Sequence, residues 1–172
     1  MCDNKCLIYV FFVNFTPCNA QANYSDMYPY KILIIDDNRA VLKSLRLVLS
    51  GVFKAVAAVP DPHLIPALLA AGDVDAVLLD MNFDSRRLDG EEGLFWLSNI
   101  GEHPNPPAVV LITAFGDIDL AMRSVKQGAE DFVTKPWDND ALIQKLVGAI
   151  EKHRQRLKTE SLASRAFSLE SE

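Results

Sequence analysis

Polar side chains stand at the ends of four of the five apolar segments in this sequence. They are two adjacent aspartates, a third aspartate, a threonine and a lysine: Asp36, Asp37, Asp80, Thr113 and Lys135. Three carboxylates brought together near a low-dielectric core repel one another unless a cation joins them. Mg²⁺ suits such a site because it takes oxygen ligands and usually keeps waters beside one or two carboxylates and a phosphate.

A metal ion, a lysine and a hydroxyl around one carboxylate form a site for phosphoryl transfer, with Asp80 as the nucleophile. Each residue alone has a plainer explanation. An aspartate pair often caps a helix, Thr113 suits a strand, and Lys135-Pro136 can simply end one. Their joint appearance at the ends of segments that share a sheet edge favours a functional site.

The apolar segments are rich in Val, Ile and Leu, which predicts strands buried on both faces of a parallel sheet. Between them apolar residues recur at helical spacing, so strands and helices alternate five times. With right-handed crossovers this is an α/β fold: a doubly wound, five-stranded parallel sheet with five helices. The predicted strands are 31–36, 53–59, 75–80, 108–113 and 131–135, and the helices lie around 41–49, 64–71, 91–100, 117–128 and 139–158.

Residues at the ends of the predicted helices have the expected types. Asn38 and Asp117 can cap the first and fourth helices, while Gly72 and Gly128 can stop the second and fourth. After about Arg154 the hydrophobic periodicity weakens. Residues 154–172 are therefore interpreted as a helix extension or linker.

Composition limits the class of protein. The 172 residues are 49% hydrophobic and 23% charged, with a net charge of −6, which argues against broad binding to nucleic acid. All three cysteines lie within the first eighteen residues, so the body of the chain is interpreted as cytoplasmic. Residues 1–28 are interpreted as an extension from a misplaced start. A secretory signal is the alternative, because Lys5, an apolar run and Ala20-Gln21-Ala22 resemble one. That run is too short to span a membrane.

Four motifs in order, "KILIIDDN", "VLLDMNFD", "LITAFGD" and "DFVTKPWD", resemble the receiver domain of bacterial two-component response regulators. The resemblance covers about Tyr30 to His153, so we expect a receiver domain at 29–153. It implies the flavodoxin-like receiver fold with strand order 2-1-3-4-5. The wording around "GLFWL" and "TKPWDND" is most similar to receivers of nitrogen-regulator-type transcription activators.

By this resemblance, Asp80 accepts a phosphoryl group from the phosphohistidine of a sensor histidine kinase. Asp37, Asp80 and the backbone carbonyl of Asn82 hold Mg²⁺, and Asp36 acts through a metal-bound water. The same resemblance implies that the protein is a switch and not an enzyme with a separate substrate.

The resemblance also implies a conformational switch. Lys135 pairs with the phosphoryl oxygens, Thr113 moves inward to hydrogen-bond one, and Phe132 turns inward with it. The Lys135-Pro136 bond matches a position that is usually cis. The face that changes is formed by the fourth helix, the fifth strand and the fifth helix, and it serves a partner protein, an output domain or a homodimer.

Two features depart from the family pattern. The stretch "FDSRRLDGEEG" is longer than usual, and we interpret its charged residues as a solvated loop face. They are Asp84, Arg86, Arg87, Asp89, Glu91 and Glu92. In addition, Phe132 lacks the hydroxyl that a tyrosine brings.

His63, His103 and His153 are isolated in sequence and have no cysteine partner, so we expect no zinc site.

Two other function classes stay open. A Mg²⁺-dependent phosphohydrolase with an aspartyl-phosphate intermediate needs a second aspartate two residues after the nucleophile, where Asn82 stands. A nucleotide-binding domain lacks its glycine-rich turn after the first strand, where "DDNRAV" stands. The sequence contains no phosphate loop for an ATPase domain and no DNA-reading unit. We therefore expect either a truncated regulator or a stand-alone receiver, without direct nucleic-acid or membrane binding.

Overall fold

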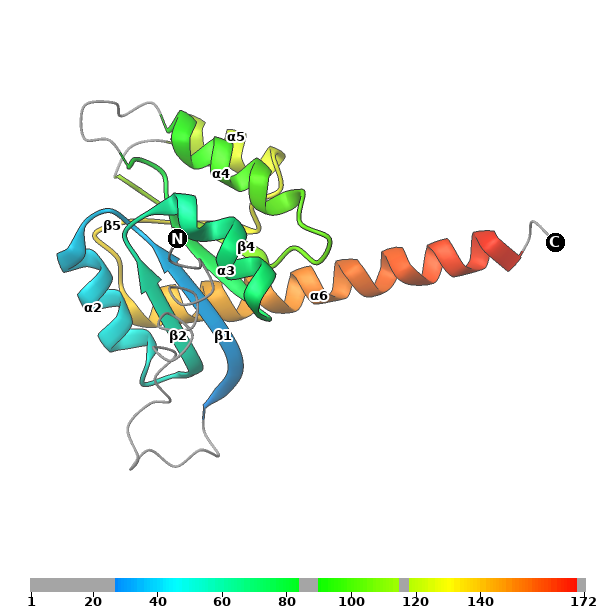
Figure 1. The fold of residues 1–172 in the computed structure, drawn as a ribbon, viewed down its shortest axis with the longest axis horizontal. Coiled ribbons are helices and arrows are strands. Elements are labelled where there is room, and N and C mark those ends of the chain that lie inside the picture. Colours follow the sequence, from blue (N-terminus) through cyan, green and yellow to red (C-terminus); the bar gives the residue numbers. More distant parts are fainter. Residues whose placement is uncertain (1–26, 84–89, 115–117, 170–172) are drawn as a thin grey trace, which may run out of the picture.

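A five-stranded parallel sheet forms the centre of the protein (Figure 1). The computed structural model describes residues 27–83, 90–114 and 118–169. The strand order β2-β1-β3-β4-β5 confirms the predicted doubly wound fold. The strands are β1 (Tyr28–Ile35), β2 (Phe53–Val59), β3 (Ala76–Asp80), β4 (Ala108–Ala114) and β5 (Asp131–Lys135).

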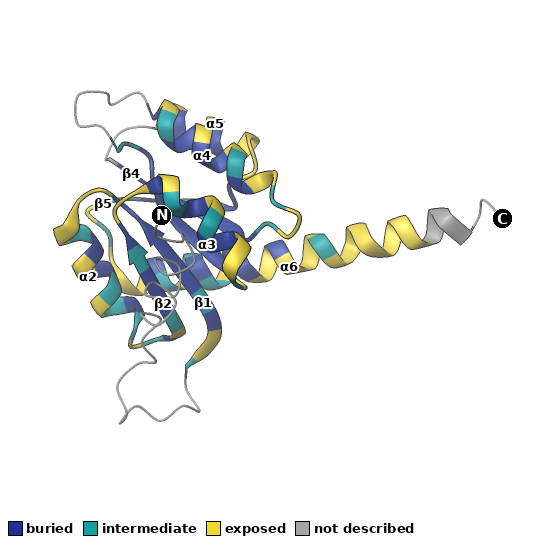
Figure 2. Cartoon of the chain, in the orientation of Figure 1, coloured by how far each residue is buried: buried dark blue, intermediate teal, exposed yellow. Residues whose placement is uncertain are grey.

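Helices cover both faces of this sheet, and each face has its own hydrophobic core. One core packs α2 (Arg39–Leu49) and α6 (Asn139–Leu169) against the sheet. The other packs α3 (Ile65–Ala71), which follows the short 3₁₀ helix η2 (Pro62–Leu64), together with α4 (Glu91–Gly101) and α5 (Ile118–Lys126). The strands are mostly buried between these layers (Figure 2).

Alternation along the strands divides their side chains between the two cores. In β1, Ile32 and Ile34 enter the core under α2 and α6, while Leu33 and Ile35 enter the opposite one. All five residues of β3 are buried. This two-sided burial explains why the strands consist of nearly continuous apolar runs.

The helix ends agree with the predicted signals where the structure describes them. Asn38 caps α2, because its Oδ1 accepts the N–H groups of Ala40 (3.0 Å) and Val41 (3.3 Å). Gly72 follows the last residue of α3, and Gly128 lies just beyond α5 with φ +107°. The predicted cap Asp117 lies outside the described residues.

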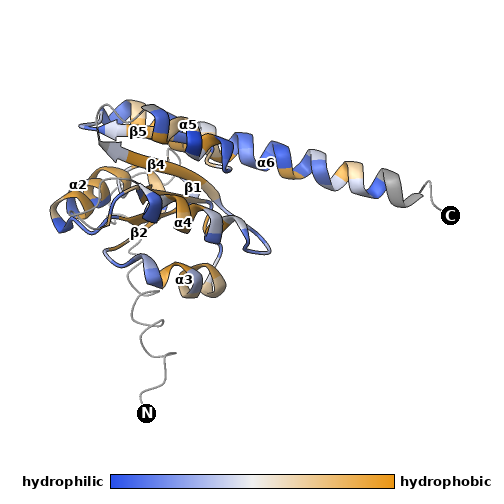
Figure 3. Ribbon diagram, turned by 90° about the horizontal axis from the view of Figure 1, so that it is seen from above, coloured by the Kyte–Doolittle hydropathy of each residue, from blue (hydrophilic) through white to orange (hydrophobic). Residues whose placement is uncertain are grey.

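Two elements extend furthest beyond their predicted bounds. Strand β1 begins at Tyr28, three residues before the predicted start, because the Tyr28 N–H donates to Val52 O (2.9 Å) and its ring packs against Phe53. Helix α6 continues without interruption to Leu169. Its last turns project beyond the sheet and are mostly hydrophilic (Figure 3). None of the helices in the described ranges has the length and apolar character needed to cross a membrane.

Candidate phosphoryl-transfer site

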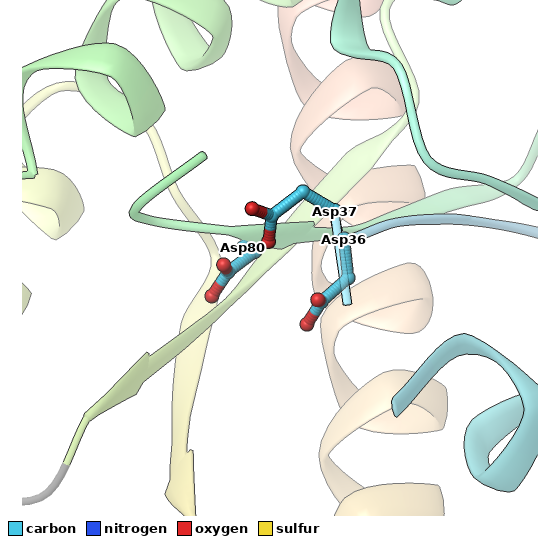
Figure 4. Close-up of side chains that lie close together, drawn as sticks. All are labelled: Asp36, Asp37 and Asp80. Atoms are coloured by element: carbon cyan, nitrogen blue, oxygen red, sulfur yellow. The ribbon is translucent and has the colours of Figure 1, made fainter. Parts of the chain in front are cut away.

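The polar strand ends meet at the carboxyl edge of the sheet. Asp36 and Asp37 directly follow β1, Asp80 is the last residue of β3, and β3 lies between β1 and β4. Each of the three side chains offers one carboxylate oxygen, and these oxygens lie within 4.8 Å of one another (Figure 4). The sheet order therefore brings together residues that are more than forty positions apart in sequence.

Burial divides the three aspartates. Asp36 is fully buried, Asp80 is 5% exposed, and Asp37 lies at the surface. Asp36 Oδ1 accepts the N–H of Asn38 at 2.8 Å, which fixes the turn between β1 and α2. The cluster thus opens to solvent on the side of Asp37 and is closed beneath it.

Lys135 is the cation that this acidic cluster contains. Its Nζ donates to Asp36 Oδ2 at 2.8 Å and to Asp80 Oδ1 at 2.9 Å. Burial opposes the positive charge, but the hydrogen bonds and charges of both aspartates outweigh it and raise the pKa of Lys135. The following peptide bond, Lys135–Pro136, is cis.

One lysine does not neutralise the cluster. Burial raises the pKa of Asp80 from 3.8 to about 6, and the charge of Asp36 adds to the effect against the attraction of Lys135. Burial and the neighbouring Asp36 also raise the pKa of Asp37. Because ionised carboxylates are unfavourable here, the cluster has the chemistry of a cation site, and its three aspartates could hold a metal ion.

Thr113 supplies an unsatisfied hydroxyl near the carboxyl end of β4, the strand that pairs with β3. The residue is 2% exposed in β4, and its Oγ1 is the one buried side-chain polar atom without a hydrogen-bond partner in the described parts of the chain. Such orphaned groups are rare in folded proteins. A hydroxyl of this kind is free to donate a hydrogen bond to a group that enters the site.

Phe132 and Asn82 occupy different surroundings from the aspartates. Phe132, in β5, is half-buried against the core under α3, α4 and α5, and Lys145 Nζ lies 5.4 Å from its ring centre. The Asn82 side chain accepts the N–H of Gly90 through Oδ1 at 3.0 Å. Asn82 therefore joins the two ends of the segment between β3 and α4.

Part of the interpretation of that segment was wrong. Glu91 and Glu92 do not belong to the loop but to the first turn of α4, inside the helix predicted at 91–100, and Glu92 Oε2 accepts the N–H of Phe83 at 3.2 Å. Sequence reasoning missed this contact, because it joins α4 to a residue nine positions earlier and depends on how the two segments pack. The other charged residues of the interpretation, at 84 to 89, lie outside the described residues.

Two transcription regulators have sequences similar to this chain. The C4-dicarboxylate transport transcriptional regulatory protein DctD of Pseudomonas aeruginosa is 29% identical over 148 residues, which cover 86% of this chain and 29% of that protein. The nitrogen assimilation regulatory protein NtrX of Azorhizobium caulinodans is 32% identical over 133 residues, covering 77% of this chain and 29% of NtrX. The chain thus spans less than a third of these two relatives.

A solved structure is similar over the same region. The N-terminal signal receiver domain of a two-component response regulator from Bacteroides fragilis is 42% identical, with a TM-score of 0.64, and the match covers 72% of this chain and 98% of that one. Residues 32–147 also match the family described as the response regulator receiver domain. This match establishes that the chain belongs to the response regulator receiver domain family, and the fold and the acidic cluster of the chain agree with it.

Proposed function

We propose that this chain is a phosphorylation-controlled switch in which Asp80 accepts a phosphoryl group from the phosphohistidine of a sensor histidine kinase in the cytoplasm. One observation carries the proposal: a buried carboxylate is hydrogen-bonded to Lys135 and lies in a sheet edge with the orphaned Thr113 hydroxyl. Asp36, Asp37, Asp80 and the backbone carbonyl of Asn82 are the residues that would hold Mg²⁺. The ion supplies positive charge to the phosphoryl oxygens when it is bound.

The side chains of the chain have separate roles in the transfer. An Asp80 carboxylate oxygen attacks phosphorus, the bond from phosphorus to the kinase imidazole nitrogen breaks, and the imidazole keeps that electron pair. Lys135 already binds Asp80 Oδ1, so its ammonium is within reach of an oxygen attached there. The Thr113 hydroxyl donates to another phosphoryl oxygen and so satisfies its own hydrogen bond.

The same steps link the site to a surface. Phe132 lies in β5, and Lys145 of α6 lies over its ring and pairs with Asp131 at 2.8 Å. An inward turn of Phe132 removes this ring from Lys145 and changes the surface formed by α5, β5 and α6. A phosphoryl group that favours one conformer by a few kcal/mol is enough to shift the populations. This surface then changes its affinity for an output domain, a partner protein or a second copy of the chain.

The relatives suggest how the switch is used. DctD and NtrX are named as regulatory proteins of dicarboxylate transport and nitrogen assimilation. We therefore propose that the receiver controls a transcription activator, either as its regulatory part or as a separate chain.

Intact-mass measurement after incubation with acetyl phosphate and Mg²⁺ tests the proposal. We expect a phosphate-sized mass gain in the full chain that is absent from Asp80→Asn and absent when Mg²⁺ is chelated. Normal phosphate uptake by Asp80→Asn would refute the assignment of the acceptor. Rapid, repeated turnover of small phosphate esters would instead support the phosphohydrolase alternative.

A further inference from the structure

We propose that Glu92 is a positioning residue for the metal ion. By accepting the N–H of Phe83, it fixes the peptide group whose carbonyl oxygen belongs to Asn82. The inference rests on the proposed function, because that function makes the Asn82 carbonyl a metal ligand. It adds a residue from α4 to a site otherwise built from strand ends.

The argument begins with the geometry of one peptide bond. The Asn82–Phe83 bond is trans. In a planar trans peptide group the C=O and the N–H point in opposite directions. Glu92 Oε2 lies 3.2 Å from the Phe83 nitrogen, so the carbonyl of Asn82 must point away from Glu92. A rotation of this peptide group, which would turn the carbonyl elsewhere, breaks the hydrogen bond.

The first turn of α4 is held in place to make this contact. Gly93 donates its N–H to Met81 O at 3.2 Å, and a Cβ at Gly93 would come within 2.7 Å of Met81 Cα. The missing side chain therefore allows α4 to lie directly on the backbone that follows Asp80. Glu92, one residue earlier, reaches Phe83 from this position.

Glu92 is not acting as an ordinary helix cap. In a capping box the glutamate of the first turn returns to the N–H of its own N-cap residue. Here the N-cap is Gly90, and its N–H is already bonded to the Asn82 side chain. Glu92 instead bonds a residue seven positions before the N-cap, next to the proposed ligand.

Residues that hydrogen-bond to metal ligands and orient them usually strengthen metal binding, and their loss typically lowers the metal affinity about 10–100-fold. A carboxylate that accepts the N–H also polarises the amide, which makes its carbonyl oxygen a better ligand. Both effects require that the side chain at position 92 reach the Phe83 N–H.

A Mg²⁺ titration of the unphosphorylated full chain, followed by ¹H–¹⁵N NMR, separates reach from charge. Glu92→Gln keeps an oxygen that can accept the Phe83 N–H, whereas Glu92→Asp keeps the charge but is one methylene too short. We expect Glu92→Asp to raise the Mg²⁺ dissociation constant about tenfold and to shift the Phe83 amide signal. Glu92→Gln should weaken Mg²⁺ binding clearly less than Glu92→Asp, because it keeps the hydrogen bond to Phe83 and loses only the charge.

Glu91→Asp is the matched control. It makes the same chemical change one residue away, at an exposed side chain that pairs with Arg123 at 2.8 Å. We expect the Mg²⁺ dissociation constant of Glu91→Asp to stay within about twofold of the unaltered chain, because the substitution keeps the negative charge of an exposed side chain. Equal affinity in Glu92→Asp and Glu91→Asp would overturn the inference, as would a Glu92→Gln variant as weak as Glu92→Asp.

Failure of the proposed function gives a different result. If the unaltered chain bound no Mg²⁺, the proposed metal site and this inference would both be refuted. If the unaltered chain bound Mg²⁺ and took up phosphate while Glu92→Asp bound Mg²⁺ equally well, only the role of Glu92 would be refuted.

Discussion

Carboxylates are buried at both ends of the parallel strands, at the carboxyl edge of the sheet and at the amino edge. The two edges balance this negative charge in opposite ways. At the carboxyl edge, Asp36 and Asp80 share the single ammonium of Lys135. At the amino edge, the Glu130 side chain is 1% exposed and faces three basic groups of α6. These are His153 at 3.0 Å, Arg156 at 2.8 Å and Lys152 at 3.6 Å.

Further contacts complete the amino edge. His153, which we considered only as an isolated histidine, also contacts Pro106 O through Nε2 at 2.8 Å. Arg154 pairs with Asp75 at 2.6 Å and lies 4.7 Å from the Tyr30 ring centre. Helix α6 is thus fixed to the sheet at residues 153–156 before its exposed end projects into solvent.

The difference distinguishes structural charges from chemical ones. A buried ion is tolerated when partners compensate it, as at Glu130. At Asp80 the partners are too few, so burial raises the pKa and the site favours an added cation. A buried carboxylate therefore indicates chemistry when its neighbourhood lacks positive charge, and the following variants test this contrast.

The largest effect on stability is expected from Glu130→Ala. It leaves His153, whose side chain is 8% exposed, without its carboxylate partner. Removing a buried carboxylate that accepts hydrogen bonds from basic groups costs about 3 kcal/mol, which urea denaturation can measure. The control is Glu151→Ala, at an exposed position of α6 close to His153. It should change the free energy of unfolding by less than about 0.5 kcal/mol. Equal effects of both variants would contradict a structural role for the amino edge.

At the carboxyl edge, removing a buried carboxylate should stabilise the folded chain at neutral pH. The folded state holds the Asp80 proton more tightly than the unfolded chain, so metal-free stability is lost as pH rises from 3.8 to about 6. The shift corresponds to roughly 3 kcal/mol at about 1.4 kcal/mol for each pKa unit. The free energy of unfolding, measured with urea, should therefore rise for Asp80→Asn relative to the unaltered chain when the pH is raised from 4 to 7. A pH-independent difference would contradict the electrostatic account.

A smaller effect is expected where α4 meets the backbone after Asp80. Gly93→Ala places a methyl 2.7 Å from Met81 Cα, which cannot move like the end of a flexible side chain. We expect a loss of about 2 kcal/mol from overpacking, measured by thermal or urea unfolding. Gly148→Ala in α6 is the control, because its Cβ meets nothing within 4 Å. That variant should gain up to about 1 kcal/mol of helix propensity, and a loss of similar size in both would contradict the close contact.

The smallest effect is expected at the outer partner of Glu130. Lys152 is 66% exposed and lies 3.6 Å from Glu130 Oε2. Exposed pairs contribute little, so Lys152→Ala should cost less than about 0.5 kcal/mol by the same urea measurement. A loss comparable to that of Glu130→Ala would show that His153 and Arg156 do not suffice to balance the carboxylate.

Much of the fold was predictable because it depends on local patterns. Apolar runs predicted the strands, with β2 and β5 placed at the observed residues, and Asn38 was correctly expected to cap the first helix. The order of the strands came from the family resemblance. The polar strand ends predicted which residues would meet, and the structure does bring Asp36, Asp80 and Lys135 into contact. Their roles in phosphoryl transfer stay predictions.

The sequence by itself determined the alternation of strands and helices and the polar residues at the strand ends, because both follow from the period of side chains along the chain. Only the tertiary structure decided the partners. Glu92 bonds Phe83 nine positions away, Glu130 meets His153 across 23 positions, and Lys135 reaches Asp36 across 99. Such contacts depend on how separate elements pack in space, and the periodicity of the sequence does not predict which distant residues will meet.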